Sequence, residues 1–125
     1  MAKELPPLSA AETEIVRLVW QLEPVSVQEI CDTISKDRPV NYATVQTLLR
    51  RLEKKGYVHH ELKGKAHLFS AAIKRDEVVK RTVGDFVERL FGGDPLPLMQ
   101  HLAGQTDLSA ADIERLKSLV KNRRK

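Results

Sequence analysis

The chain has 125 residues, of which 42% are hydrophobic and 30% charged, enough apolar material for a core and too much for a wholly disordered protein. Its apolar runs stay far below the roughly 20 residues that span a bilayer, and no signal peptide is recognisable. Cys31 is the single cysteine and cannot form an internal disulfide, so we expect a cytoplasmic protein without membrane insertion; the formal net charge is +4.

Two capping boxes predict the starts of the first two helices. Ser9 stands three residues before Glu12, and Ser26 stands three residues before Glu29, so each pair can satisfy two free backbone N–H groups. Apolar residues recur at helical spacing behind each box. This pattern predicts one helix that ends before Pro24 and a second, shorter helix that ends near residue 34.

A third helix is predicted from Tyr42 to Lys55. Asn41 is a good N-cap for this helix, and Gly56 suits a left-handed C-cap. The apolar stripe expected to face the core consists of Val45, Leu48, Leu49 and Leu52. Helical spacing then turns the polar side chains of this helix toward solvent.

A hairpin and three more helices complete the predicted order. Residues 57–62 and 66–70 flank a short polar link, which predicts two antiparallel strands, and helices are expected over about 75–91, 96–102 and 110–121. Three helices followed by a hairpin match the winged-helix plan. We therefore expect a mainly α fold with a small β-hairpin wing. It would comprise a winged helix-turn-helix DNA-binding domain over residues 1–72 and a helical dimerisation domain over residues 73–125.

The third helix and the hairpin carry the residues that we expect to contact DNA. Residues 41–67 have a net charge of +4, whereas residues 1–40 and 68–116 are net negative. Gln and Thr can contact base edges, Arg grips phosphate or guanine, and lysines at a hairpin tip can reach the DNA backbone. The candidate DNA contacts are Asn41, Tyr42, Ala43, Thr44, Gln46, Thr47, Arg50, Arg51, Lys54, Lys63 and Lys65. A solvated polar helix face is the alternative interpretation.

The C-terminal helices have more apolar surface than one such arm can bury against itself. A second copy of the chain would supply the missing partner surface, which predicts a homodimer. The candidate dimerisation residues are Val79, Val83, Phe86, Val87, Leu90, Phe91, Leu98, Leu102, Ile113, Leu116 and Val120.

Four segments carry a resemblance to a known family. They are LSAAE at 8–12, VQEI at 27–30, YATVQTLLRRLEKKG at 42–56 and DLS at 107–109. Together they resemble the penicillinase-repressor (BlaI/MecI/CopY) family of bacterial transcription regulators, over about residues 8–121. The resemblance implies a repressor that binds a palindromic double-stranded DNA operator as a homodimer with entwined C-terminal helices. It also implies a membrane sensor metallopeptidase as a partner and a signal that acts on the C-terminal region.

Two family features are missing from this sequence. Copper-responsive members end in a Cys-x-Cys arrangement, whereas Cys31 is the single thiol here. β-Lactam-responsive members carry a cleavable Asn-Phe dipeptide, and this chain reads MQHLA at the corresponding residues 99–103. The inducing signal therefore does not follow from the resemblance.

No arrangement of residues indicates an enzyme or a cofactor. Gly-rich phosphate loops, nucleophile elbows and metal-ligand spacings are lacking, and His59 and His60 would point to opposite faces of a strand. Two alternatives to an operator-binding, signal-relieved repressor remain. One is a winged-helix protein–protein adaptor, which would not need the basic block, and the other is a repressor released by a small ligand at the dimer interface.

Overall fold

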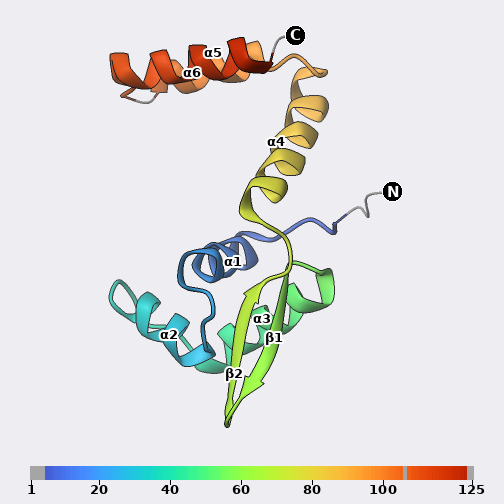
Figure 1. Cartoon of the computed structure of the whole chain (residues 1–125), viewed down its shortest axis with the longest axis vertical. Helices are drawn as coiled ribbons and strands as arrows, with labels where there is room; N and C mark the ends of the chain where they lie inside the picture. Colours follow the sequence, from blue (N-terminus) through green and yellow to red (C-terminus); the bar gives the residue numbers. More distant parts are fainter. Residues whose placement is uncertain (1–4, 106, 124–125) are drawn as a thin grey trace. The chain divides into compact units, whose positions relative to one another are not determined.

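A computed structural model describes residues 5–105 and 107–123. The elements follow the order α1 (Ala10–Leu22), α2 (Val27–Ser35), α3 (Tyr42–Lys55), β1 (Val58–Lys63), β2 (Ala66–Ala71), α4 (Arg75–Phe91), α5 (Leu96–Gln105) and α6 (Ala110–Arg123) (Figure 1). The predicted fold class, mainly α with one β-hairpin, is confirmed. No helix in the described ranges is long and apolar enough to cross a membrane.

Contacts divide the chain into two compact units, with the boundary between Val79 and Lys80 inside α4. The first unit holds α1 to α3, the hairpin and the start of α4, and the second holds the rest of α4 with α5 and α6. The sequence places the boundary between residues 72 and 73. Its assignment of DNA binding to one part and dimerisation to the other stays a prediction.

Helix starts in the first unit follow the predicted capping. The Ser9 hydroxyl accepts a hydrogen bond from the Glu12 N–H at 3.1 Å, and the Ser9 N–H donates to the Glu12 carboxylate at 2.8 Å. The pair at the start of α2 is reciprocal in the same way, with distances of 3.1 and 2.9 Å. Asn41 caps α3 by accepting from the Ala43 N–H, and Gly56 ends α3 with a φ of 94°.

The core of the first unit lies where α1, α2 and α3 meet the base of the hairpin. The predicted apolar stripe of α3 is buried, and Cys31 belongs to the same core. Val25, in the link between α1 and α2, forms an antiparallel bridge with Phe69 of β2 through two backbone hydrogen bonds of 3.0 and 2.7 Å. This bridge attaches the base of the hairpin to the helices.

The hairpin pairs β1 and β2 antiparallel, from Val58 opposite Ala71 to Lys63 opposite Ala66. Val58 and Phe69 are buried at its base, whereas every residue from His59 to His67 is exposed. Gly64 takes a φ of 62° in the turn, a left-handed conformation that favours glycine. The hairpin is therefore held at its base and extends its tip into solvent, and it is called the wing below.

Candidate nucleic-acid interface

Helix α3 presents a polar and basic face opposite its buried stripe. At 3.6 residues per turn, Ala43, Thr47, Arg50 and Lys54 lie close to the line directly opposite that stripe, and all four are exposed. Gln46 lies to one side of this line and is half-buried. The outward face thus combines a small residue, a hydroxyl and two cations on one straight path along the helix.

The C-terminal end of α3 is fixed against α1 by Lys55. Its ammonium donates to the Glu12 carboxylate at 2.6 Å and to the Pro7 carbonyl at 2.9 Å. Glu12 is 2% exposed, and hydrogen bonds, first from Lys55 and then from the Ser9 N–H, lower the pKa of its carboxyl although burial opposes this. Lys55 therefore holds α3 in position against α1. Its ammonium is already bound within the chain, whereas Lys54 is exposed and can contact a ligand.

A groove of about 400 Å³ lies between α3 and the wing. Its walls come from the first turn of α2, one side of α3 and the inner face of the wing, and its lining includes Gln28, Tyr42, Gln46, Arg50, Glu53, His60, Lys65 and Phe69. Two cations and several hydrogen-bonding groups therefore border one concave surface beside the outward face of α3. The two cations, Arg50 and Lys65, give this border of the groove the charge that an anionic ligand such as a DNA strand requires.

One polar pair crosses the groove from α3 to the wing. The Nδ1 atom of His60 lies 2.8 Å from each carboxylate oxygen of Glu53. The His60 ring also lies 5.1 Å from the ring of His67 and 5.3 Å from that of Phe69, measured between centroids. His60 thus faces α3, and the alternation of a strand turns His59 to the other face, as the sequence predicts.

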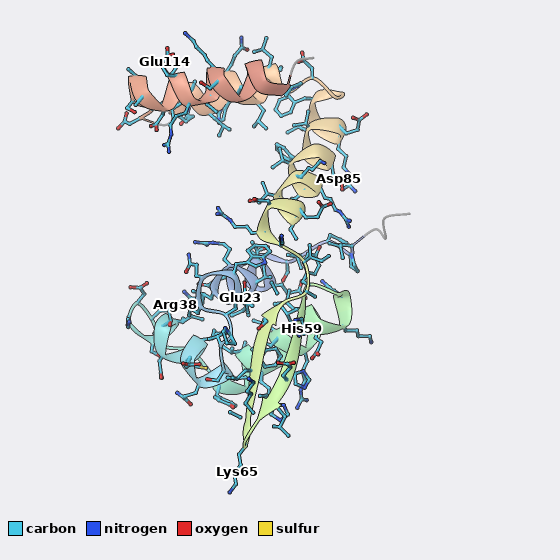
Figure 2. All side chains as sticks on the ribbon, viewed as in Figure 1. Glu23, Arg38, His59, Lys65, Asp85 and Glu114 are labelled. Carbon is cyan, nitrogen blue, oxygen red and sulfur yellow. The ribbon has the colours of Figure 1, made fainter. Side chains whose placement is uncertain are left out.

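The wing tip carries Lys63 and Lys65, both exposed. Figure 2 shows the Lys65 side chain extending from the tip, away from the strands. Of the eleven predicted DNA contacts, ten are exposed and Gln46 is half-buried, and all lie on α3, at its N-cap or on the wing. The sequence reasoning missed Glu53, His60 and the first turn of α2, although helical spacing places Gln46, Arg50 and Glu53 along one side of α3.

Within the described residues, no group of three His, Cys, Asp or Glu side chains is placed to hold a metal ion. Three histidines of the wing, His59, His60 and His67, are close together in the sequence. In the structure, His60 instead pairs with Glu53 and packs against two rings.

The second unit exposes most of the predicted dimerisation residues. Exposed fractions in the single chain reach 46% for Val83, 47% for Phe86 and 64% for Leu90, and Leu102, Ile113 and Leu116 are exposed as well. Val79, which falls in the first unit, is 45% exposed. Val87 is already buried in the single chain, Phe91 and Leu98 are half-buried, and the side chain of Val120 lies outside the described residues.

A helix-turn-helix with a basic second helix and a lysine-tipped wing defines the winged helix-turn-helix class of DNA-binding regulators. The fold of Staphylococcus aureus MarR, in a structure with salicylate and kanamycin, is similar, with a TM-score of 0.55 at 15% identity over 92% of this chain and 70% of that chain. Residues 8–122 match the Penicillinase repressor family. The chain therefore belongs to the penicillinase repressor family, whose members regulate transcription and are not enzymes.

Individual relatives agree with this assignment. The penicillinase repressor of Staphylococcus aureus is 30% identical over 120 residues, which cover 96% of this chain and 95% of that protein. The penicillinase repressor of Bacillus licheniformis is 26% identical, with 98% of each chain covered. The solution structure of monomeric Bacillus licheniformis BlaI in complex with the blaP half-operator has a TM-score of 0.51 and 29% identity, covering 61% of this chain and 93% of that chain.

Proposed function

We propose that this chain is a transcriptional repressor that binds an operator in double-stranded DNA as a homodimer. The observation that carries the proposal is the exposed polar and basic face of α3 beside a groove and a wing tipped with Lys63 and Lys65. A repressor of the same family, BlaI, has been solved in complex with a half-operator. The charge of +4 over residues 41–67 also favours DNA over a protein partner, because an adaptor has no use for it.

The proposed contacts divide into two kinds. Thr44, Gln46 and Thr47 contact base edges or nearby phosphates in the major groove, and Ala43 lets the helix backbone approach closely. Phosphate contacts come mainly from five exposed cations, and these are Arg50, Arg51, Lys54, Lys63 and Lys65. Asn41 and Tyr42 are exposed at the start of α3 and complete the set.

The proposal of a homodimer rests on the exposed apolar side chains of the second unit. Large apolar residues that are 42–64% exposed along three successive helices are unusual on a monomeric protein. Burying this surface against a second copy gains about 25 cal/mol per Å² of apolar area. Because a two-fold dimer presents two α3 helices, its operator would be palindromic, with half-sites about one helical turn apart or a multiple of it.

Relief of repression is proposed to act through the second unit. Two linked half-sites bind at a high effective concentration, so separating the chains lowers operator affinity steeply. A membrane sensor metallopeptidase is the partner that the family suggests, and it would have to cleave a bond other than Asn-Phe, since residues 99–103 read MQHLA.

Selection from a pool of random-sequence duplexes tests the proposal directly. We expect enrichment of a two-fold symmetric site by the purified full-length chain, and weaker binding to that site by Arg50→Ala. Arg89→Ala removes the same charge from an exposed position of α4 outside the candidate site and should bind normally. Failure of the wild-type chain to bind any duplex at low ionic strength would refute the proposal.

A further inference from the structure

The distal half of the wing has few contacts that fix its direction. The strands are anchored at their base by the buried Val58 and Phe69, and the residues from His59 to His67 are exposed. His60 and His67 share the face of the hairpin that turns toward α3, because His60 stands opposite Phe69 and its ring lies 5.1 Å from that of His67. The pair between His60 and Glu53 therefore ties the wing to α3 beyond its anchored base.

Because the pair of His60 and Glu53 lies partway along the wing, a small change in its geometry would move the wing tip. Gly64 lies four positions beyond His60, a span of about 13 Å in extended chain. A change of about 10° in the direction of the hairpin at His60 would then move the tip by about 2 Å over that span. Hydrogen bonds to phosphate tolerate only a few tenths of an ångström, so after such a movement Lys63 and Lys65 would have to change side-chain conformation to keep their contacts, which weakens them.

We propose that Glu53 is a positioning residue that sets the wing over the DNA backbone through its hydrogen bonds with His60. The inference rests on the proposed DNA-binding function and adds to it a coupling between α3 and the wing.

A mutant cycle separates positioning from the loss of one charge. The probe is a fluorescein-labelled duplex of mixed sequence, roughly three helical turns long, titrated by anisotropy with the full-length chain over a range of low salt concentrations. In the wild type, replacing Lys63 and Lys65 together by alanine should reduce the slope of log affinity against log salt by about two for each chain, or about four for the dimer. In the Glu53→Gln background the same replacement should reduce the dimer's slope by less than two, because the wing no longer reaches the backbone.

Glu61→Gln is the matched control for Glu53→Gln. It removes the same charge from an exposed residue of β1, one position along the strand from His60 and on the other face. The full effect of the two lysines should persist in this background. An equal loss of slope in the wild-type, Glu53→Gln and Glu61→Gln backgrounds would overturn the positioning role.

Replacing the other member of the pair gives a second, independent test. In the His60→Ala background, replacing Lys63 and Lys65 should again reduce the slope by less than half of the wild-type change, as in Glu53→Gln. In the His59→Ala background, where the altered side chain lies on the opposite face of β1, the full change should persist. An effect of His59→Ala equal to that of His60→Ala would overturn the inference. If the wild-type chain bound no duplex at low salt, the proposed function itself would fail.

Discussion

Replacing Glu12 by glutamine tests how the recognition helix is held in place. Glu12 is 2% exposed, and its carboxylate accepts hydrogen bonds from the Ser9 N–H at 2.8 Å and from the Lys55 ammonium at 2.6 Å. Glutamine keeps the shape and can still accept from Ser9, so the substitution removes chiefly the charge that faces Lys55. Lys55 is the last residue of α3, and losing this pair should loosen that end of the helix.

Glu29→Gln supplies the reference for the magnitude. Glu29 has the same place in the capping box of α2 as Glu12 has in that of α1, but it is exposed and forms no ion pair with another described residue. We expect Glu29→Gln to cost about 0.5–1 kcal/mol as a weakened cap. A hydrogen bond to a charged group contributes about 1.5–3 kcal/mol, and Lys55 is about one quarter exposed. After a discount for this exposure, Glu12→Gln should cost about 1–2 kcal/mol more than Glu29→Gln.

Urea denaturation of the full-length chain at neutral and acid pH measures this difference. The pKa of Glu12 is lowered in the folded chain, so its contribution is complete above the ordinary glutamic acid pKa of about 4.3 and is lost as the pH falls through the folded value. Wild type and Glu12→Gln should therefore converge in stability at acid pH, because the side chain at position 12 is then uncharged in both. A difference that stays constant with pH, or that never exceeds the Glu29→Gln effect, would refute the ion-pair reasoning.

Three further substitutions test the proposed DNA-binding face and the dimer. Arg50→Ala should weaken binding to all duplexes alike and reduce the salt slope in a binding titration by about one for each chain, or about two for the dimer. An unchanged slope would contradict its contact with phosphate. Gln46→Ala should reduce discrimination at one base position by about 1–3 kcal/mol in competition with altered sites, whereas equal loss on random DNA would exclude base reading. Leu90→Glu should reduce the mass by light scattering from twice 14.2 kDa to 14.2 kDa, and Leu62→Glu, equally exposed on the wing, should leave it unchanged.

The parts of this fold that depend on residues close together in the sequence could be predicted from the sequence. Both capping boxes, the Asn41 cap and the Gly56 end of α3 are local arrangements, and the structure confirms them. The apolar period of α3 likewise determined which of its faces is buried, and hence which side chains are exposed as candidate DNA contacts. The bounds of α3 and α4 agree with the prediction, whereas α5 extends past the predicted end at residue 102 to Gln105.

Contacts between distant segments could not be predicted in this way. Glu12 and Lys55 are 43 residues apart, and the Trp20 indole donates to the Ile73 carbonyl across 53 residues. Such pairs depend on how whole elements pack, which helical or strand periodicity does not encode. The same holds for Val87, whose place in the apolar stripe of α4 cannot distinguish burial within one chain from burial between two. The apolar periodicity of α4 therefore shows which face of the helix can form an interface. It does not show which residues of that face remain exposed in the single chain.

The two proposed roles of the chain are connected by the number of phosphate contacts. Each chain offers five exposed cations on α3 and the wing, so a dimer on its operator offers ten. If all of them met phosphates, the slope of log affinity against log salt would be about −9 for the dimer and about −4.5 for a single chain. A substitution in the second unit that separates the chains should thus halve the salt slope although it leaves α3 untouched. A substitution on α3 would instead reduce the slope in steps of about two per dimer, so the two kinds of defect can be told apart by one titration.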